Sequence, residues 1–370
     1  MVKRLILDQN ENMYRILCCF KNFNQYKYLI IWFIFLFFFQ APHFVCAQST
    51  KNLRFGFYNL ENFFDTEVDS TLDYNAFTPD GEQRWTLSRY ITKRNNVFKA
   101  IVSMGKDTPL TLIGFCEVEN ESVLFDLIAR TPLKALDYRI VHFESPDRRG
   151  IDVGLIYRKT MLTLIVARPI PVKDTNDVSF LTRDILFASF LHNDSDTVYV
   201  YVNHWPSRYG GQLESVKKRL LAATTLRQHV DSVLNARPFA KIVVMGDFND
   251  TPLDESIIYG LKAFSPEFIY STDQLIHLFT SPDELGYEGT LKHQHSWQIF
   301  DQIMISQHLY YAKEGLHFRR GSARIFAPSF LLMDDERHLG KKLYRTYTGP
   351  TYLGGFSDHL PVFIDLEWTP

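Results

Sequence analysis

The sequence predicts an α/β protein in which β-sheets pack on each other and helices cover the outside. Short apolar runs rich in β-branched and aromatic residues recur along the chain, and several are continuous instead of alternating, as in strands covered on both faces. Helical stretches lie between some of these runs, which favours sheets with outer helices. The predicted strands are Leu53–Asn59, Leu110–Glu117, Asp152–Tyr157, Leu162–Val166, Ile185–Leu191, Thr197–Asn203, Lys241–Gly246, Gln302–Ile305 and Pro361–Leu366.

Three longer segments are predicted as helices. Asn120 caps a helix over Glu121–Ala129 that has acidic residues in its first turn. The other two are amphipathic. Leu87–Met104 places Ile91, Phe98, Ile101 and Val102 near one face, and Gln212–Leu234 turns Leu213, Val216, Leu220, Ala223 and Val230 inward.

The segment Gly315–Gly355 lacks a clear period and is rich in Arg and Lys. We interpret it as a long functional loop within one domain, because no linker, repeat or low-complexity tract occurs from Lys51 onward.

The N-terminal residues 1–47 have the pattern of an export signal. Lys21 and Lys27 precede an apolar run, Leu29–Phe39, and Val45-Cys46-Ala47 provides small residues before a cut at Gln48. Translation starting at Met13 would shorten the charged region. The alternative is an uncleaved membrane anchor, since Leu29–Ala47 is 19 residues without a formal charge. We expect an exported protein, periplasmic, secreted or on the surface, and in the alternative a protein anchored through residues 29–47.

Without residues 1–47 the chain carries 35 basic and 40 acidic side chains, and Cys116 is its only cysteine. This balance excludes a polycation that binds nucleic acid by net charge alone. A single cysteine also excludes an intrachain disulfide, so the core must provide the stability.

Polar residues recur where the apolar runs stop. Strand ends on a rigid sheet hold side chains in fixed positions, and carboxylates gathered there repel each other unless a cation is present. Hard oxygen ligands select Mg²⁺, with Mn²⁺ or Ca²⁺ as alternatives, over zinc. The polar residues at these strand ends are Asn59, Glu61, Glu117, Asn203, His204, Asp247, Asn249, Asp301, Asp358 and His359.

Six phrases in this order resemble the endonuclease/exonuclease/phosphatase superfamily, the DNase-I-like fold, and especially its bacterial exported members. They are YNLENFFD, SPDRRGIDVGLIYR, NHWPSRYGG, GDFND, FDQIMIS and SDHLPV, and the resemblance covers residues 51–370 as one domain. It implies a four-layer α-β-β-α sandwich with its site at one edge of two sheets. It also implies a metal-dependent phosphoester hydrolase.

The resemblance assigns roles by position. Glu117 resembles the principal metal ligand, helped by Glu61 and Asn59, and Asp358 resembles a ligand of the same or a second metal. His359 resembles the histidine next to the scissile phosphate, and Asp301 resembles the carboxylate that fixes its tautomer. The remaining roles are orientation of the attacking water, binding of phosphate and protonation of the leaving group. They fall to Asp247, Asn249, His204, Arg208 and Arg149.

Purely structural interpretations of the same residues remain open. Asp247–Asn249 is also typical of an Asx turn that closes a strand. Glu117 also suits a solvated strand exit, and His204 beside Trp205 suits an aromatic cluster. Asp152 either takes part in the site or forms a structural ion pair with an arginine. The basic residues between Arg319 and Arg345 form either a solvated face or a rim that faces substrate.

Three function classes follow. The first is an exported nuclease or phosphodiesterase acting on nucleic acid, and no protein partner is predicted. The second keeps the chemistry but acts on a phospholipid head group or a small phosphate ester. An apolar protrusion at Ile325–Met333 would favour the membrane contact that a phospholipid requires. The third is a surface binding protein without catalysis, which predicts that site residues are missing.

Overall fold

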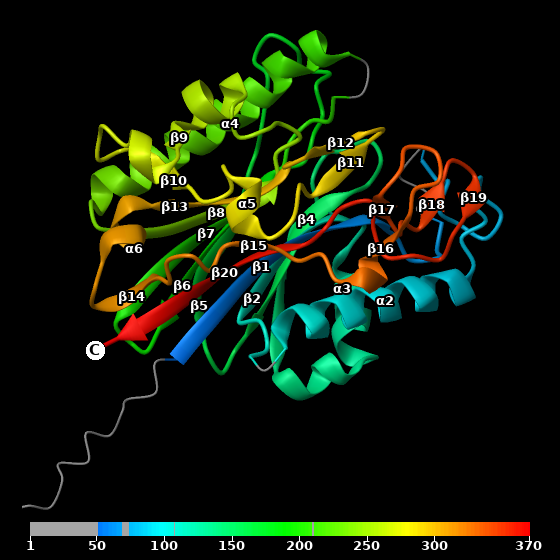
Figure 1. Ribbon diagram of the computed structural model, residues 1–370, viewed down its shortest axis with the longest axis horizontal. Coiled ribbons are helices and arrows are strands. Elements are labelled where there is room, and N and C mark those ends of the chain that lie inside the picture. Colours follow the sequence, from blue (N-terminus) through cyan, green and yellow to red (C-terminus); the bar gives the residue numbers. More distant parts are fainter. Residues whose placement is uncertain (1–50, 69–73, 107, 209–210) are drawn as a thin grey trace, which may run out of the picture. The chain divides into compact units, whose positions relative to one another are not determined.

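Two seven-stranded sheets form the centre of the part of the chain that the computed structural model describes, residues 51–68, 74–106, 108–208 and 211–370 (Figure 1). Sheet A has the order β14-β20-β1-β2-β4-β3, with β15 also paired to β20, and sheet B has the order β5-β6-β7-β8-β13-β10-β9. The strands of sheet A are β1 (Lys51–Phe63), β2 (Leu112–Val118), β3 (Tyr138–His142), β4 (Asp152–Arg158), β14 (Gly315–Phe318), β15 (Arg324–Ile325) and β20 (Val362–Thr369). Those of sheet B are β5 (Thr163–Ile170), β6 (Ile185–His192), β7 (Asp196–His204), β8 (Lys241–Asp247), β9 (Ala263–Phe264), β10 (Leu275–His277) and β13 (Asp301–Ser306).

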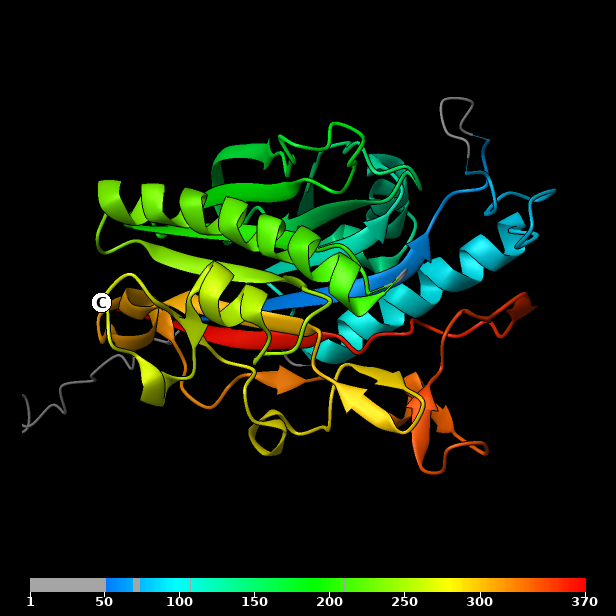
Figure 2. The same cartoon turned by 90° about the horizontal axis from the view of Figure 1, so that it is seen from above.

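Helices lie on the outer face of each sheet. α2 (Leu87–Gly105) and α3 (Glu121–Ala129) cover sheet A, and α4 (Gln212–Ala236) runs along the strands of sheet B (Figures 1 and 2). The predicted α-β-β-α sandwich is therefore confirmed. The shorter helical segments are α5 (Pro282–Leu285), α6 (Gln307–Tyr311), the 3₁₀ turns Pro132–Leu136, Pro266–Phe268 and Ser329–Leu331, and a π-helical turn at Ser256–Leu261.

The continuous apolar runs are buried on both sides. In β7, Val198, Val200 and Val202 belong to the core between the sheets, whereas Tyr199 and Tyr201 belong to the cluster under α4. Successive side chains of a strand point to opposite faces, so a strand with two covered faces needs apolar residues at every position.

The predicted inner face of α2 is partly wrong. Ile91 and Val102 are 36% and 46% exposed, and the buried positions include Tyr90, Lys93 and Val97 instead. The pattern of apolar residues does not predict the buried face of α2, because Lys93, a charged residue, lies on that face. The Lys93 ammonium donates to Thr346 Oγ1 at 2.6 Å and to the Phe356 carbonyl at 2.5 Å.

The segment 315–355 is more regular than expected. After β14 and β15 it forms two short hairpins, β16 (Leu332–Asp334) with β17 (Lys341–Leu343) and β18 (Tyr347–Thr348) with β19 (Thr351–Tyr352). Another hairpin, β11 (Leu291–His293) with β12 (Ser296–Gln298), precedes it.

The stretch Ile325–Met333 does not form the apolar protrusion considered for membrane contact. Ile325 and Leu331 are buried, and Phe326, Phe330 and Leu332 pack against the core. No helix in the described part of the chain is long and apolar enough to cross a membrane. The predicted signal or anchor in residues 1–47 lies outside the described residues.

Candidate active site

The strand directions bring the predicted residues to one edge of both sheets. β7 and β8 run parallel and end there, while β13 is antiparallel to β8 and begins there. As a result His204, Asp247 and Asp301 are neighbours across three adjacent strands, with His204 paired to Asp247 and Asp247 paired to Asp301 in the register. These three residues come from segments that are far apart in the sequence. Their spacing along the chain therefore does not reveal that they lie side by side in the sheet.

Sheet A supplies a second row opposite the first. β1 and β2 run parallel, and Asn59 pairs with Cys116, the residue before Glu117. The Asn59 amide Nδ2 donates to Asp247 Oδ2 at 3.0 Å and lies 3.5 Å from Glu117 Oε1. One amide thus joins carboxylates from the two sheets.

The backbone is strained where these side chains leave the strands. Glu61, Asn62, Glu117 and Asn249 have φ values of 50°, 58°, 57° and 51°, in the left-handed region that non-glycine residues seldom adopt. The register of β2 with β4 also shifts between Cys116 and Val118, as in a β-bulge, which re-aims the intervening side chain. Such strain collects at functional sites when the surrounding structure holds it.

His359 and Asp301 form a buried pair. Nδ1 of the imidazole lies 2.6 Å from Asp301 Oδ2, and Nε2 lies 3.8 Å from Asp247 Oδ2. Burial alone lowers the pKa of His359, but the carboxylates of Asp301 and Asp247 outweigh burial and hold this pKa well above its ordinary value. The geometry is that of a histidine whose tautomer and ring orientation are fixed by a carboxylate.

The two carboxylate oxygens of Asp247 make different contacts. Its Oδ1 accepts from the Asn249 amide at 2.9 Å, so the predicted Asx turn does exist. Its Oδ2 accepts from Asn59 and faces both histidines. Burial raises the pKa of Asp247 to about 7, with Asp301 adding to the shift and the charge of His359 opposing it.

His204 faces the same space from β7. Its Nε2 lies 3.8 Å from Asp247 Oδ2 and 4.0 Å from Glu117 Oε1, whereas its Nδ1 is buried without a hydrogen-bond partner within the described residues. Burial holds the pKa of His204 well below its ordinary value, and the charges of Arg183 and Arg149 add to this effect. A neutral imidazole at this position suits an acceptor or a ligand better than a fixed cation.

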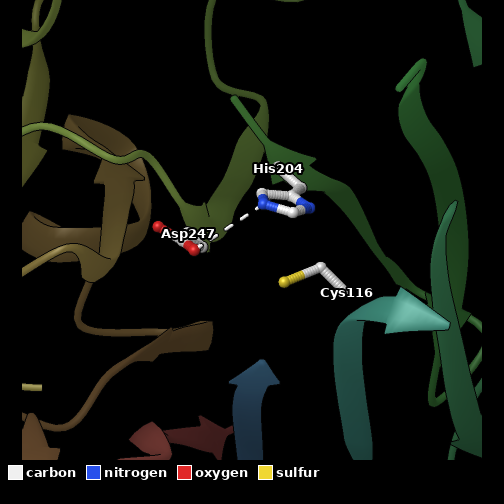
Figure 3. A group of neighbouring side chains, drawn as sticks. All are labelled: Cys116, His204 and Asp247. Carbon is white, nitrogen blue, oxygen red and sulfur yellow. Dashed lines mark ion pairs between the residues drawn. The ribbon is translucent and has the colours of Figure 1, made fainter. Parts of the chain in front are cut away.

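Cys116 was not predicted at the site. Figure 3 shows its sulfur directed toward the space between His204 and Asp247, and one ligand atom from each of the three residues lies within 4.8 Å of the others. Burial raises the pKa of the thiol well above its ordinary value, so it is a neutral, buried group under the site.

Glu61 and Asp358, both predicted as metal ligands, are held by Arg345. The arginine Nε donates to Glu61 Oε1 at 3.0 Å, and its Nη2 donates to Asp358 Oδ2 at 2.8 Å. The other Glu61 oxygen accepts from the Thr346 amide at 2.6 Å. Burial raises the pKa of Glu61, to which Asp358 adds, and Lys93 and Arg345 oppose the shift. Arg345 is therefore a basic residue of segment 315–355 whose side chain contacts predicted site residues.

The two predicted phosphate-binding arginines lie beside this row. Arg208 donates through Nε to the Asn249 carbonyl at 2.9 Å and through Nη2 to Asp250 and Asp254, so it also fixes the turn after β8. Arg149 is 42% exposed by its side chain and lies 3.6 Å from Asp147.

Asp152 has structural contacts, and none of them is an ion pair with an arginine among the residues that the structure describes. Its Oδ1 accepts from the Ser145 amide at 2.9 Å, and its Oδ2 lies 3.2 Å from His142 Nε2.

The donor set fits a divalent cation. Carboxylate oxygens of Glu117 and Asp247 converge on Asn59 Nδ2 from different sheets, and burial disfavours the charge of Asp247 unless a cation offsets it. Carboxylate and amide oxygens are hard ligands, as Mg²⁺, Mn²⁺ and Ca²⁺ prefer. Glu61 and Asp358 differ from Glu117 and Asp247, because Arg345 donates to one oxygen of each of them.

Comparisons with known proteins agree with this geometry. A model described as the endonuclease/exonuclease/phosphatase family matches residues 54–368. No curated protein matches the chain.

Three solved structures illustrate the similarity in fold. The chain is 14% identical to ANGEL2, a 2′,3′-cyclic phosphatase, with a TM-score of 0.56 over 87% of this chain and 97% of that chain. It is 16% identical to the catalytic domain of human Nocturnin, with a TM-score of 0.51 over 86% and 95%. It is 15% identical to a mannosyl-6-phosphatase of Bacteroides thetaiotaomicron, with a TM-score of 0.51 over 85% and 99%. At these identities the likeness concerns the fold alone.

Proposed function

This chain belongs to the endonuclease/exonuclease/phosphatase family, whose members hydrolyse phosphate esters with divalent metal ions, and we propose that it is an exported, Mg²⁺-dependent phosphodiesterase that cleaves nucleic acid. The export part rests on the signal-like pattern of residues 1–47. The choice of Mg²⁺, with Mn²⁺ or Ca²⁺ as substitutes, rests on the carboxylate oxygens of Glu117 and Asp247, which converge from the two sheets.

The observation that carries the proposal is the buried His359–Asp301 pair facing Asp247, with His204 and Glu117 within 4.0 Å of each other beside it. Asp301 holds a proton on Nδ1 of His359, so Nε2 is directed to the reacting phosphate. Asp247 and Asn249 orient the attacking water on one side of that phosphate. His204, which burial keeps neutral, contacts the phosphate as a hydrogen-bonding group.

A bound divalent cation would supply electrostatic stabilisation of the charge that develops on the phosphoryl oxygens. Glu117, helped by Asn59, would hold it. The chain itself adds the guanidinium of Arg345, which two carboxylates hold in place at the edge of the site. A planar guanidinium in a fixed orientation is suited to contact a phosphate oxygen.

Cationic cavities on two sides of the acidic site favour a polymeric anion as substrate. One cavity of about 270 Å³ is lined by Arg337, Lys342 and Arg345, and also by Asp358 and the ion pair of Lys292 with Asp335. The other is lined by Arg148, Arg149, Arg183 and Lys218. A chain of net negative charge that places its cations beside the site can still bind a nucleic-acid backbone locally.

A second candidate function is hydrolysis of a small phosphate ester. It is supported by the fold it shares with the 2′,3′-cyclic phosphatase and the mannosyl-6-phosphatase above. A phospholipid substrate has less support, because Ile325–Met333 packs against the core. A binding protein without catalysis predicts lost site residues, whereas His359, Asp301, Asp247 and Glu117 are all in place.

The test is a substrate panel for the purified protein, consisting of single- and double-stranded DNA, RNA, sphingomyelin and phosphate monoesters with Mg²⁺, Mn²⁺ or Ca²⁺. The proposal predicts cleavage of a polynucleotide that stops with EDTA. Turnover of a lipid or a sugar phosphate without cleavage of any polynucleotide would reject the nuclease function and leave phosphoester hydrolysis.

A further inference from the structure

A cavity of about 920 Å³ adjoins the candidate site on the side of His204. Pro206 and Ser207, which directly follow β7 and Trp205, form part of its wall. Arg183 connects the cavity to the site, because its guanidinium donates to the carbonyls of His204 and Trp205 at 3.2 Å and 2.7 Å. The cavity is therefore next to the segment that carries His204.

The cavity is strongly cationic. Four of its lining residues, Arg148, Arg149, Arg183 and Lys218, are cations, and Asp177 is its only lining carboxylate in the part of the chain that the structure describes. Arg183 is neutralised by Asp147 at 2.8 Å, but the contacts of the other cations are weaker. Arg148 donates to the Ser179 carbonyl at 3.4 Å, and Arg149 lies 3.6 Å from Asp147.

Asp177 offsets only one of these positive charges, and Lys218 is a cation that interacts with it. Its Oδ1 accepts from the backbone amide and the hydroxyl of Ser179 at 3.0 Å and 2.6 Å, so the carboxylate closes its own turn. Arg148, Arg149 and Lys218 thus leave the cavity with an excess of positive charge. One of these cations also acts on the candidate site, because the charge of Arg149 contributes to the low pKa of His204.

Two aromatic side chains accompany the cations. Tyr74 and Phe180 line the same cavity, and Lys218 Nζ lies 5.9 Å from the centre of the Phe180 ring. Cations that follow a backbone and aromatic rings that stack on bases are the combination by which proteins bind single-stranded nucleic acid. A sugar phosphate or an inorganic anion would use the cations alone.

We propose that this cavity binds the phosphate next to the scissile one on a single nucleic-acid strand, with Arg148 and Lys218 contacting the phosphate and Tyr74 and Phe180 contacting the base. This inference rests on the proposed function and specifies the substrate of the same site. It adds Arg148 and Lys218 as binding residues, although the family resemblance assigned no role to either of them.

The test compares wild type with the double variant Arg148→Gln/Lys218→Gln. The matched control is Lys134→Gln/Lys313→Gln, which removes two exposed lysine charges outside the cavity. Binding of fluorescein-labelled decathymidylate is measured by anisotropy in EDTA over a series of salt concentrations. Each lost phosphate contact lowers the slope of log K against log[salt] by about 0.7 for a single strand. Because both cations contact one phosphate, the cavity variant is expected to lose about 0.7 and the control none.

Hydrolysis gives the second readout. With Mg²⁺, the ratio of kcat/KM for the decathymidylate to kcat/KM for bis(p-nitrophenyl) phosphate, a diester without a neighbouring phosphate, is expected to fall about tenfold in the cavity variant, through KM. Tyr74→Leu is expected to weaken decathymidylate binding without changing the salt slope, because a stacked base adds affinity but no charge contact.

The two proposals fail in different ways. An unchanged salt slope and an unchanged ratio in the cavity variant would overturn the cavity assignment even if wild type cleaves both substrates. If wild type cleaves neither substrate, the proposed function is wrong, and the binding slopes in EDTA still decide whether the cavity holds a strand phosphate.

Discussion

Oδ2 of Asp301 lies 2.6 Å from Nδ1 of His359, and both side chains are buried at the edge where the two sheets meet. The pair joins the first residue of β13 to the segment before β20, so each sheet contributes one partner. Since Nδ1 is engaged, Nε2 is the nitrogen left to face Asp247 and the substrate.

Asp301→Asn should lower kcat about 10²–10⁴-fold with a smaller change in KM, because the amide no longer stabilises the charged imidazole or fixes its tautomer. Steady-state kinetics on a labelled oligonucleotide measure the effect. Asp283→Asn, which alters an exposed carboxylate in α5, is the control and should keep the wild-type rate. A kcat within twofold of wild type for Asp301→Asn would contradict the role of the pair.

Glu117→Gln and Glu61→Gln should have different effects, although both residues were predicted as metal ligands. Glu117 converges with Asp247 on Asn59, so its replacement is expected to raise the apparent Kd for Mg²⁺ at least tenfold, the lower end of losses seen when residues that support a metal site are changed. Glu61→Gln should change Mg²⁺ affinity less than Glu117→Gln, because Arg345 and the Thr346 amide hold both Glu61 oxygens. Titration by isothermal calorimetry distinguishes them, and equal losses would show that Glu61 binds the ion directly.

Arg345→Met should destabilise the fold by about 1–3 kcal/mol, less than a fully buried pair would, because the arginine side chain is 42% exposed. The change leaves Glu61 buried beside Asp358 with one of its charged partners removed. Urea denaturation measures the difference. In the double variant Arg345→Met/Glu61→Gln, part of the loss should return, and an additive loss would argue that the two residues are not coupled.

Without metal, the contribution of Asp247 to stability should decrease as the pH rises from about 4 to 8, opposite in direction to the contribution of His204, whose pKa burial lowers. The pKa of Asp247 is raised to about 7 in the folded protein, so between its unfolded value near 4 and about 7 the folded state keeps a proton that the unfolded state releases. His359, whose folded pKa is also raised, acts in the same direction above its unfolded value near 6.5.

The measurement is the Tm in EDTA at pH 5.5 and pH 8, compared between wild type and Asp247→Asn. The variant should lose less Tm over this interval than wild type. Saturating Mg²⁺ should raise the Tm more at pH 8 than at pH 5.5, because the ion competes with a proton at the lower pH. A wild-type Tm that falls no more than that of Asp247→Asn would contradict the assignment.

Strand-end polar residues and family phrases together were sufficient to predict most of the site. His204, Asp247 and Asp301 end or begin buried strands, and a sheet register that places strand ends side by side makes them neighbours. The predicted strands in sheet B also followed from local sequence, since a doubly covered strand is apolar at every position.

Lys93, Cys116 and Arg345 could not be predicted in the same way. In the sequence, Lys93 has the pattern of a solvated position of an amphipathic helix. Only its contacts with Thr346 and Phe356, in a distant hairpin region, show why its side chain is buried. Arg345 is one of several basic residues in a segment without a period, and its partners Glu61 and Asp358 lie 284 and 13 residues away. Such long-range ion pairs leave no local pattern in a sequence.

The most direct test of the central claim is the single-turnover cleavage rate of a labelled oligonucleotide by wild type and His359→Ala with Mg²⁺, with circular dichroism to confirm that both are folded. The account predicts rapid cleavage by wild type, none in EDTA, and a rate at least about 10²-fold lower for His359→Ala. Equal cleavage by a folded His359→Ala protein would show that the converging carboxylates and imidazoles do not form the catalytic site.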